Sequence, residues 1–434
     1  MIRRAVIGAV VAVASAGVSS GTVAAAASAE PRFDLVDEWT RQLPNPVSYP
    51  PLVVDDLLIA VATPEGAGAS TLYGLDRMSG TMRFERALPA RIEAAPIEAG
   101  PLVIVRFENA SLLAIDAHNG DVRWQAPIGS SAKGPAPPVA SFSGLVGTRA
   151  QLDLRPDDSL YVGSQHGDVR RLRLLDGKLL WRRKLPMAAL APPELTGGLV
   201  YVGVGELPFG PKSKGALYAL DPDTGRVRWH RGVDGPVMQP PTIAPPGVAF
   251  VATHFGGTHA RDDTLWALDR SGGVAFRAQP GGKLTRPLAH AANIVVASSS
   301  GSVRSFHPRQ GMSWQTEIGA SQSAGLISAE PDFVATGSAI VGLDGGSGKT
   351  RWRVAAPNAV IGTPSGVVLP LSSSLTGELV IVDSRDGTVL GRRALHDTGR
   401  GDIASDRRVY HVDSGGTLHA FRLDPLQSQT AGLL

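Results

Sequence analysis

Four residues of kinds that bind metal ions lie within one short stretch of the sequence. His254, His259, Asp262 and Asp263 occur there together with two glycines. Imidazole and carboxylate groups are common ligands of zinc and other transition metals. Their spacing, however, matches none of the usual metal-site patterns. We therefore expect a solvated loop here, and a metal site is the less favoured interpretation.

Two other motifs resemble binding sites, but each lacks a required part. Residues 345–350 resemble a phosphate-binding loop, yet Leu343 stands where the first glycine should be, and no helical pattern follows. Asp221 and Asp223 are spaced like the start of a calcium loop, but the later acidic ligand is missing. We interpret both segments as turns.

The stretch 217–229 shows which structural element carries these turns. It reads Leu-Tyr-Ala-Leu-Asp-Pro-Asp-Thr-Gly-Arg-Val-Arg-Trp. Its first residues alternate between two faces of an extended chain, as expected for a strand. The Asp-Pro-Asp-Thr-Gly segment is typical of a tight turn, because glycine adopts positive φ there at no steric cost. The stretch therefore predicts a β-hairpin.

This hairpin recurs along the chain at intervals of 37 to 57 residues. Each copy has a glycine four residues after the position of Asp221. Such a period is typical of a four-stranded propeller blade. The eight pairs of anchor and glycine are Asp76 and Gly80, Asp116 and Gly120, Arg173 and Gly177, Asp221 and Gly225, Asp269 and Gly273, His307 and Gly311, Asp344 and Gly348, and Asp383 and Gly387.

An aromatic residue follows the anchor at seven or eight positions in seven of these copies. Most of the tryptophans occupy this position, including Trp124, Trp181 and Trp229. A large aromatic side chain at a fixed repeat position is best explained by packing between neighbouring blades. We therefore do not interpret the tryptophans as a stacking platform for a cofactor.

The two ends of the chain each carry part of one further unit. Residues 33–43, with Trp39 and Leu43, resemble a return strand that has no hairpin before it. Residues 409–423 contain the earlier strands of a unit but no return strand. We predict an all-β propeller of four-stranded blades, with eight contiguous units and one split blade that the N-terminal strand closes. Closure removes the exposed edges of an open sheet.

The composition indicates one exported domain. Residues 1–29 resemble a cleaved signal peptide, with Arg3 and Arg4 before an apolar stretch and Ala27-Ser28-Ala29 before Glu30. Residues 30–434 would then form a single propeller domain that is secreted or periplasmic. The chain has no Cys, which excludes both disulfides and a lipid anchor on cysteine. Its net charge is +3 without a basic run, so we expect no nucleic-acid partner.

The repeat Leu-Tyr-Ala-Leu-Asp-x-x-Thr-Gly-x-x-x-Trp resembles that of the PQQ-like β-propeller superfamily, which includes quinoprotein and BamB-type proteins. The resemblance covers nearly all of the mature chain and implies a propeller, with eight blades as the family norm. Members of the superfamily include quinone-dependent dehydrogenases and also scaffolds without a cofactor. The dehydrogenases typically carry a vicinal cysteine pair and a calcium site. The chain has no cysteine and no recognisable calcium set, so we expect no cofactor.

Three functions therefore remain open. The favoured one is a non-catalytic exported scaffold that binds a protein or another envelope component. The alternatives are a PQQ-dependent dehydrogenase and a hydrolase or lyase that acts from the central funnel. The sequence does not identify the partner, the oligomeric state or catalytic residues, and it does not decide between eight and nine blades.

A candidate partner-binding rim follows from two long connections in neighbouring blades, at residues 205–215 and 253–263. Both join the second and third strands of a blade, so we expect them side by side on one face of the ring. Long ordered loops are often functional. Aromatic side chains surrounded by cations would suit a partner with apolar and acidic features. The rim residues are Phe209, Lys212, Lys214, His254, Phe255, His259 and Arg261.

Overall fold

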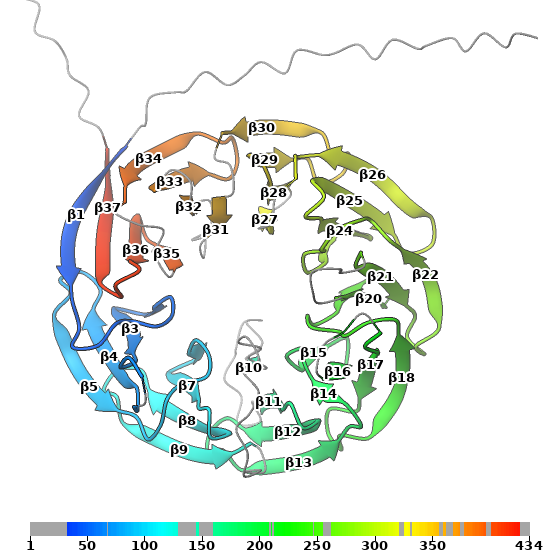
Figure 1. The fold of residues 1–434 in the computed structure, drawn as a ribbon, viewed down its shortest axis with the longest axis horizontal. Helices are drawn as coiled ribbons and strands as arrows, with labels where there is room; N and C mark the ends of the chain where they lie inside the picture. The colour runs from blue at the N-terminus through cyan, green and yellow to red at the C-terminus, as the bar shows by residue number, and fades with distance from the viewer. Residues whose placement is uncertain are drawn as a thin grey trace, which may run out of the picture.

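Nine antiparallel β-sheets form a closed ring in the computed structural model (Figure 1). The structure describes residues 33–66, 68–128, 145–146, 159–207, 210, 212–245, 247–254, 262–320, 325–329, 332–355, 359–361, 368–373, 377–395 and 401–425. Within these ranges the regular elements are all β-strands. Eight sheets have four strands and one has five. The predicted all-β propeller with a split closing blade is confirmed, and the nine sheets decide the blade number that the sequence left open.

Each sheet is one blade, and in all but the closing blade the strands run in chain order from the inside of the ring outward (Figure 1). The first four blades are β2 (Leu52–Val54), β3 (Leu57–Ala62), β4 (Thr71–Asp76) and β5 (Met82–Ala87); β6 (Ile97–Ala99), β7 (Leu102–Arg106), β8 (Ser111–Asp116) and β9 (Val122–Pro127); β10 (Leu145–Val146), β11 (Ser159–Gly163), β12 (Asp168–Arg173) and β13 (Leu179–Lys184); and β14 (Ala188–Ala189), β15 (Glu194–Thr196), β16 (Leu199–Gly205), β17 (Gly215–Leu220) and β18 (Val227–Val233). The next four are β19 (Thr242–Ala244), β20 (Val248–Thr253), β21 (Thr264–Leu268) and β22 (Val274–Ala278); β23 (Leu288–His290), β24 (Asn293–Ala297), β25 (Ser302–His307) and β26 (Gly311–Glu317); β27 (Gly325–Ala329), β28 (Asp332–Thr336), β29 (Ile340–Leu343) and β30 (Thr350–Val354); and β31 (Ala359–Ile361), β32 (Val368–Ser373), β33 (Glu378–Asp383) and β34 (Val389–Ala394). The closing blade consists of β35 (Gly401–Ser405), β36 (Arg408–Val412), β37 (Leu418–Pro425) and β1 (Phe33–Arg41).

The five-stranded blade differs from the sequence prediction at its inner edge. A four-stranded blade has one inner strand, but here two short strands, β14 and β15, both pair with β16. Pro192 and Pro193 lie between them. Proline has no backbone N–H for a sheet ladder, which explains the interruption.

The predicted hairpin is present at residues 217–229. Leu220 on β17 pairs with Val227 on β18, and the Gly225 amide donates to the Asp221 carbonyl at 2.9 Å. The Asp221 carboxylate accepts two further amide hydrogen bonds from the turn. The fifth hairpin is shorter than expected. There the positive φ belongs to Gly272, at 81°, and not to Gly273.

Four hairpins share an ion pair that the sequence analysis did not identify. The anchor Asp of each hairpin accepts a hydrogen bond from the Arg seven residues later, at 2.5–2.6 Å. This hydrogen bond is the main cause that lowers the pKa of each carboxyl group, to about 2 for Asp76 and Asp221. The pairs are Asp76 and Arg83, Asp116 and Arg123, Asp221 and Arg228, and Asp344 and Arg351.

These ion pairs predict acid sensitivity of the fold. The carboxyl pKa is lower in the folded chain than its usual value of 3.8, so the stabilisation is complete above pH 4. It is lost as the pH falls through the folded value near 2. We expect the melting temperature to fall between pH 4 and pH 2, and an Asp76→Asn/Asp221→Asn variant to show a shallower fall. Equal slopes for the two proteins in thermal melts would contradict this prediction.

Tryptophan side chains join neighbouring blades at these hairpins, as predicted. A Cβ atom at Gly225 would lie 2.6 Å from the Trp181 ring, so this position has room only for glycine. The Trp181 indole N–H also donates to the Pro222 carbonyl at 2.7 Å. The same packing on the next hairpin occurs at Trp39, Trp124, Trp229, Trp314 and Trp352, and Phe84 takes this place in one blade.

The ring closes through the N-terminal strand, as predicted. β1 pairs along its length with β37 and completes the closing blade. Trp39 then packs on Gly80 of the first blade, and its indole N–H donates to the Arg77 carbonyl at 3.2 Å. The buried Tyr410 hydroxyl donates to the same carbonyl at 3.0 Å. Both chain ends are therefore joined to the first blade.

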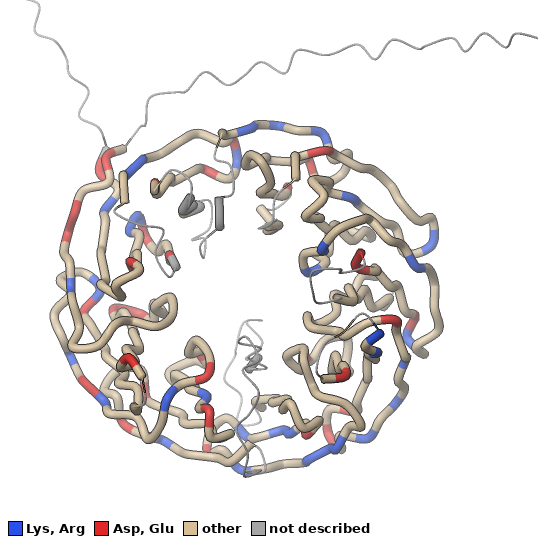
Figure 2. Tube along the Cα trace, viewed as in Figure 1, with Lys and Arg blue, Asp and Glu red and all other residues tan. Residues whose placement is uncertain are grey.

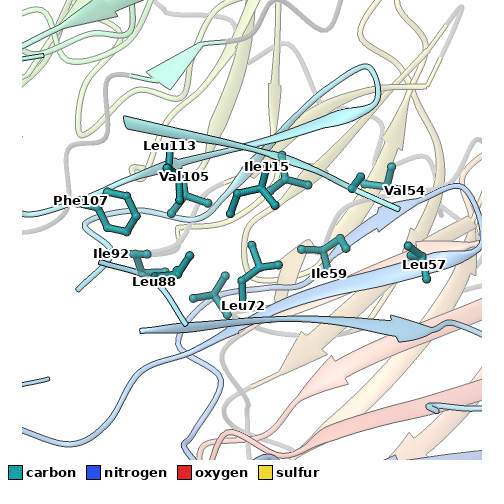
Figure 3. Packing of buried hydrophobic residues seen from close by; sticks show 13 residues of the cluster. Val54, Leu57, Ile59, Leu72, Leu88, Ile92, Val105, Phe107, Leu113 and Ile115 are labelled. Carbon is teal, nitrogen blue, oxygen red and sulfur yellow. The ribbon is translucent and has the colours of Figure 1, made fainter. Parts of the chain in front are cut away.

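The hydrophobic core lies between successive blades. One cluster joins the β2–β5 blade to the β6–β9 blade (Figure 3). Ile59 and Leu72 lie on one side of this layer, and Val105, Leu113 and Ile115 on the other. Strands β3 and β8 are buried along their whole length, as expected for strands with packed neighbours on both faces.

The predicted signal peptide lies outside the described residues. In the part of the chain that the structure describes, no helix is long and apolar enough to span a membrane.

Candidate functional site

The two faces of the ring are built differently. One face, here called the hairpin face, carries the Asp-x-x-x-Gly turns. The opposite face, here called the loop face, carries the connections between second and third strands and the linkers between blades. The structure describes the ends of the two predicted rim loops, 206–214 after β16 and 254–263 after β20. These ends lie on the loop face because both loops occupy the same connection in adjacent blades.

A linker at residues 234–237 holds the bases of these two loops next to each other. On one side, the Val237 amide donates to the Val204 carbonyl of β16 at 3.3 Å. On the other side, the His254 amide donates to the Pro236 carbonyl at 2.9 Å. A Cβ atom at Gly205 would lie 2.7 Å from the Pro236 side chain, so the linker passes close to the first loop. The two loops thus begin on either side of one linker.

The first loop carries exposed cationic side chains on a closed base. The Glu206 amide donates to the Lys214 carbonyl at 3.0 Å, and the Glu206 carboxylate accepts the Lys214 amide at 2.9 Å. A second turn forms where the Ser213 amide donates to the Gly210 carbonyl. Lys212 and Lys214 are both exposed. The base therefore presents two ammonium groups to solvent.

The base of the second loop is fixed by a buried carboxylate. The Asp263 side chain has no exposed surface, and His254 Nδ1 lies 2.8 Å from one of its oxygens. Lys283 Nζ lies 3.3 Å from the other oxygen, and the Leu284 amide donates at 2.9 Å. These partners come from the loop itself and from the next inter-blade linker. Asp263 therefore ties the loop to the neighbouring blade.

Burial by itself would raise the pKa of the Asp263 carboxyl group. The hydrogen bond and charge of His254, the Leu284 amide and the Lys283 ammonium outweigh this effect, and the net shift of the pKa is downward. The carboxylate is therefore ionised at neutral pH. An ionised group without exposed surface is stable only while these partners remain in place.

The sequence prediction of a solvated loop is wrong for the two ends of this segment. Only 14% of the His254 side chain is exposed, and Asp263 is fully buried. Asp262 accepts a hydrogen bond from the Gly282 amide at 2.8 Å. Among the described residues, no group of three or more His, Asp or Glu side chains could hold a metal ion. Phe209, Phe255, His259 and Arg261 lie outside the described residues.

One polar cluster in the closing blade was not identified from the sequence. His411 Nδ1 lies 2.7 Å from Asp402, and both side chains are at least 97% buried. His419 is the cross-strand neighbour of His411 and contacts Asp413 at 3.2 Å. These histidines line a cavity of about 180 Å³ beside Arg393. The only signal in the sequence is that His411 occupies the place of valines on β11 and β16.

A second cavity, of about 320 Å³, lies between two inter-blade linkers, the β24–β25 connection and the start of β27. Gln239, Lys283 and Arg286 contribute its polar lining. Arg286 also forms an ion pair with Glu194 of the five-stranded blade at 2.6 Å. This pair links two blades that are separated by the β19–β22 blade. Lys283 and Arg286 are charged side chains of the kind that the funnel alternative requires.

The nine-sheet ring, the hairpin repeat and the tryptophan docking define a β-propeller of PQQ-type repeats. The profile of the family described as outer membrane protein assembly factor BamB matches residues 8–191 and 165–335, which together exceed half of the chain. The chain belongs to this family.

Relatives with this name are only distantly similar. The chain is 26% identical over 167 residues to the outer membrane protein assembly factor BamB of Yersinia pestis, an alignment that covers 38% of this chain and 39% of the relative. It is 23% identical over 289 residues to BamB of Moranella endobia, an alignment that covers 61% of this chain and 73% of the relative. The crystal structure of BamB from Moraxella catarrhalis is 17% identical, with a TM-score of 0.50, and covers 89% of this chain and 99% of that chain. At this identity the likeness shows the fold alone.

Proposed function

We propose that the protein is an exported, non-catalytic propeller that binds a protein of the cell envelope through the rim on its loop face. The rim consists of the two loops at 206–214 and 254–263. The observation that carries this proposal is the arrangement of their bases on either side of the linker 234–237. Loops whose bases are adjacent on a rigid scaffold are a usual position of binding residues.

The chemistry of the rim suggests the kind of partner. Lys212 and Lys214 supply exposed positive charge, and the sequence adds Phe209 and Phe255 to the same loops. Aromatic anchors within a polar, charged rim are typical of protein–protein interfaces. An acidic protein surface with an apolar centre would complement these residues. The relatives named as outer membrane protein assembly factors support a partner in the envelope.

Charge reversal on the rim tests this proposal. We expect a Lys212→Glu/Lys214→Glu variant to recover the partner from envelope extracts at least about tenfold less efficiently, because repulsion replaces attraction at the interface. The readout is quantitative mass spectrometry of proteins captured on immobilised propeller. Lys349→Glu on the hairpin face is the matched control and should capture as the wild type does.

Removing the predicted aromatic anchors gives an independent test of the same surface. A Phe209→Ala/Phe255→Ala variant with an unchanged melting temperature should lose the same captured protein. If both rim variants capture the same proteins as the wild type in equal amounts, the rim is not the binding surface.

A further inference from the structure

The outermost strand of one blade lacks an ion pair that four other blades carry. In four blades the anchor Asp and the Arg seven residues later form an ion pair on the outer strand. In the β10–β13 blade, Arg173 replaces the Asp and Leu180 replaces the Arg. Arg173 instead pairs with Asp176 of the turn at 2.9 Å. At this position β13 therefore lacks the arginine that the outer strands of those four blades carry.

Three leucines are exposed where this charge is missing. The exposed fractions are 73% for Leu175, 48% for Leu179 and 42% for Leu180. A bulge lies in this part of β13, because Trp181 pairs with Arg171 while Leu179 pairs with Leu172. Leu179 and Leu180 thus lie opposite one residue of β12, and both are turned toward solvent. Consecutive exposed leucines on a strand are unusual for a soluble surface.

β13 is also a sheet edge. It is the last strand in the order β10-β11-β12-β13, so alternate N–H and C=O groups point away from the sheet. Charged side chains on an edge strand normally discourage pairing with another chain. The arginines at this position in four other blades, Arg83, Arg123, Arg228 and Arg351, fulfil this protective role. At β13 this position is Leu180, and the bulge positions on β22, β26 and β34 are also uncharged, as Ala275, Ser313 and Leu390. Leu180 is 42% exposed, whereas Leu390 is half-buried.

Positive charge surrounds the leucines. Lys178 is exposed, and the side chains of Arg182 and Lys184 are 50% and 60% exposed. Arg182 and Lys184 share one buried carboxylate, that of Asp168, at 2.6 and 3.8 Å. Lys and Arg also recur along the outer circumference of the ring (Figure 2). The edge therefore carries a surplus of positive charge beside an apolar centre.

We propose that β13 binds an extended peptide segment with alternating apolar and acidic side chains, which adds to the blade as a further strand. The free backbone groups of β13 would supply the hydrogen bonds, and the leucines and cations would select the sequence. A second copy of this chain fits less well, because pairing β13 with itself would bring the same cations together. A lipid surface would leave the backbone edge groups without partners.

A defined peptide tests this inference directly. The probe is a fluorescein-labelled octapeptide of alternating Val and Glu, and fluorescence anisotropy measures its Kd. Two control peptides separate the contribution of charge from that of backbone hydrogen bonds. The first replaces each Glu by Lys. The second carries N-methyl groups on the valines and so cannot form the backbone hydrogen bonds of a strand. We expect both control peptides to bind at least about tenfold more weakly.

Matched variants locate the binding surface. Leu179→Gln/Leu180→Gln should weaken binding of the Val-Glu peptide at least about tenfold. Val274→Gln/Met312→Gln removes exposed apolar side chains, 47% and 57% exposed, from the outer strands β22 and β26 and should leave the Kd unchanged. Hydrogen exchange should show slower exchange of β13 amides when the peptide is bound. The rim variants should bind the peptide normally, so the two surfaces are tested separately.

Four results would overturn the proposal. The first is no binding of the Val-Glu peptide up to about 1 mM, and the second is equal binding of the N-methylated peptide. The third is sedimentation that shows a dimer which the Leu179→Gln/Leu180→Gln variant loses, since the edge would then bind another copy. The fourth is adsorption to phosphatidylglycerol vesicles that depends on the same leucines.

Discussion

Deletion of residues 30–41, which removes β1, is expected to lower the free energy of unfolding by about 5 kcal/mol or more. The strand buries Leu35 and places Trp39 on the first blade. Its Glu38 forms a two-pronged ion pair with Arg408, at 2.7 and 2.9 Å, in which both side chains are nearly buried. Urea unfolding followed by tryptophan fluorescence and circular dichroism measures the change.

Single substitutions on β1 divide this effect into parts. Trp39→Ala should lower the free energy of unfolding by about 3 kcal/mol. This value is at the low end of the range for replacing a tryptophan by alanine, because the Trp39 ring is only partly buried. Asp34→Asn, on the exposed side of the strand, should change stability by less than about 0.5 kcal/mol. If the deletion leaves the urea midpoint unchanged, β1 does not pair with β37 in solution.

The second large effect is expected from Asp263→Ala, which should destabilise the fold by about 3 kcal/mol. The substitution leaves His254 Nδ1 and the Leu284 amide without their buried partner and separates Lys283 from its carboxylate. The base of the second rim loop would then lose its attachment to the next blade. Partner capture should therefore weaken together with stability.

Asp262→Ala is the matched control for this prediction. Asp262 is the exposed neighbour in the same loop and accepts one hydrogen bond, from the Gly282 amide. Loss of this hydrogen bond should lower the free energy of unfolding by no more than about 1 kcal/mol. Equal urea midpoints for Asp263→Ala and the wild type would show that the buried carboxylate does not hold the loop.

The repeat made most of the fold predictable because each blade is specified by local chemistry. Gly225 must adopt positive φ and must lack a side chain where Trp181 packs. Both requirements select glycine, so the position can be recognised in the sequence. The split blade was predictable for the same reason, since Trp39 belongs to this pattern without a hairpin before it. The break between β14 and β15 was missed although Pro192 and Pro193 stand there.

The candidate sites were less predictable because they depend on contacts between distant segments. Asp263 was expected in solvent, but the linker that carries Lys283 and Leu284 covers it. The pairing of His411 with Asp402 depends on the register of two strands, and the sequence does not fix that register. The exposure of Leu180 became informative only when the ion pairs of four other blades showed that an arginine stands at this position there.

The closure of the ring by β1 has a consequence for the order of folding. β1 is made first, yet its pairing partner, β37, ends at residue 425, so the contact joins residues almost 400 positions apart. Contacts of such long sequence separation form late. Throughout synthesis β1 is a strand without a neighbour, and such strands tend to aggregate. Asp34, Asp37 and Glu38 place negative charge along it, which keeps the nascent strand from pairing with other chains before its own partner has been made.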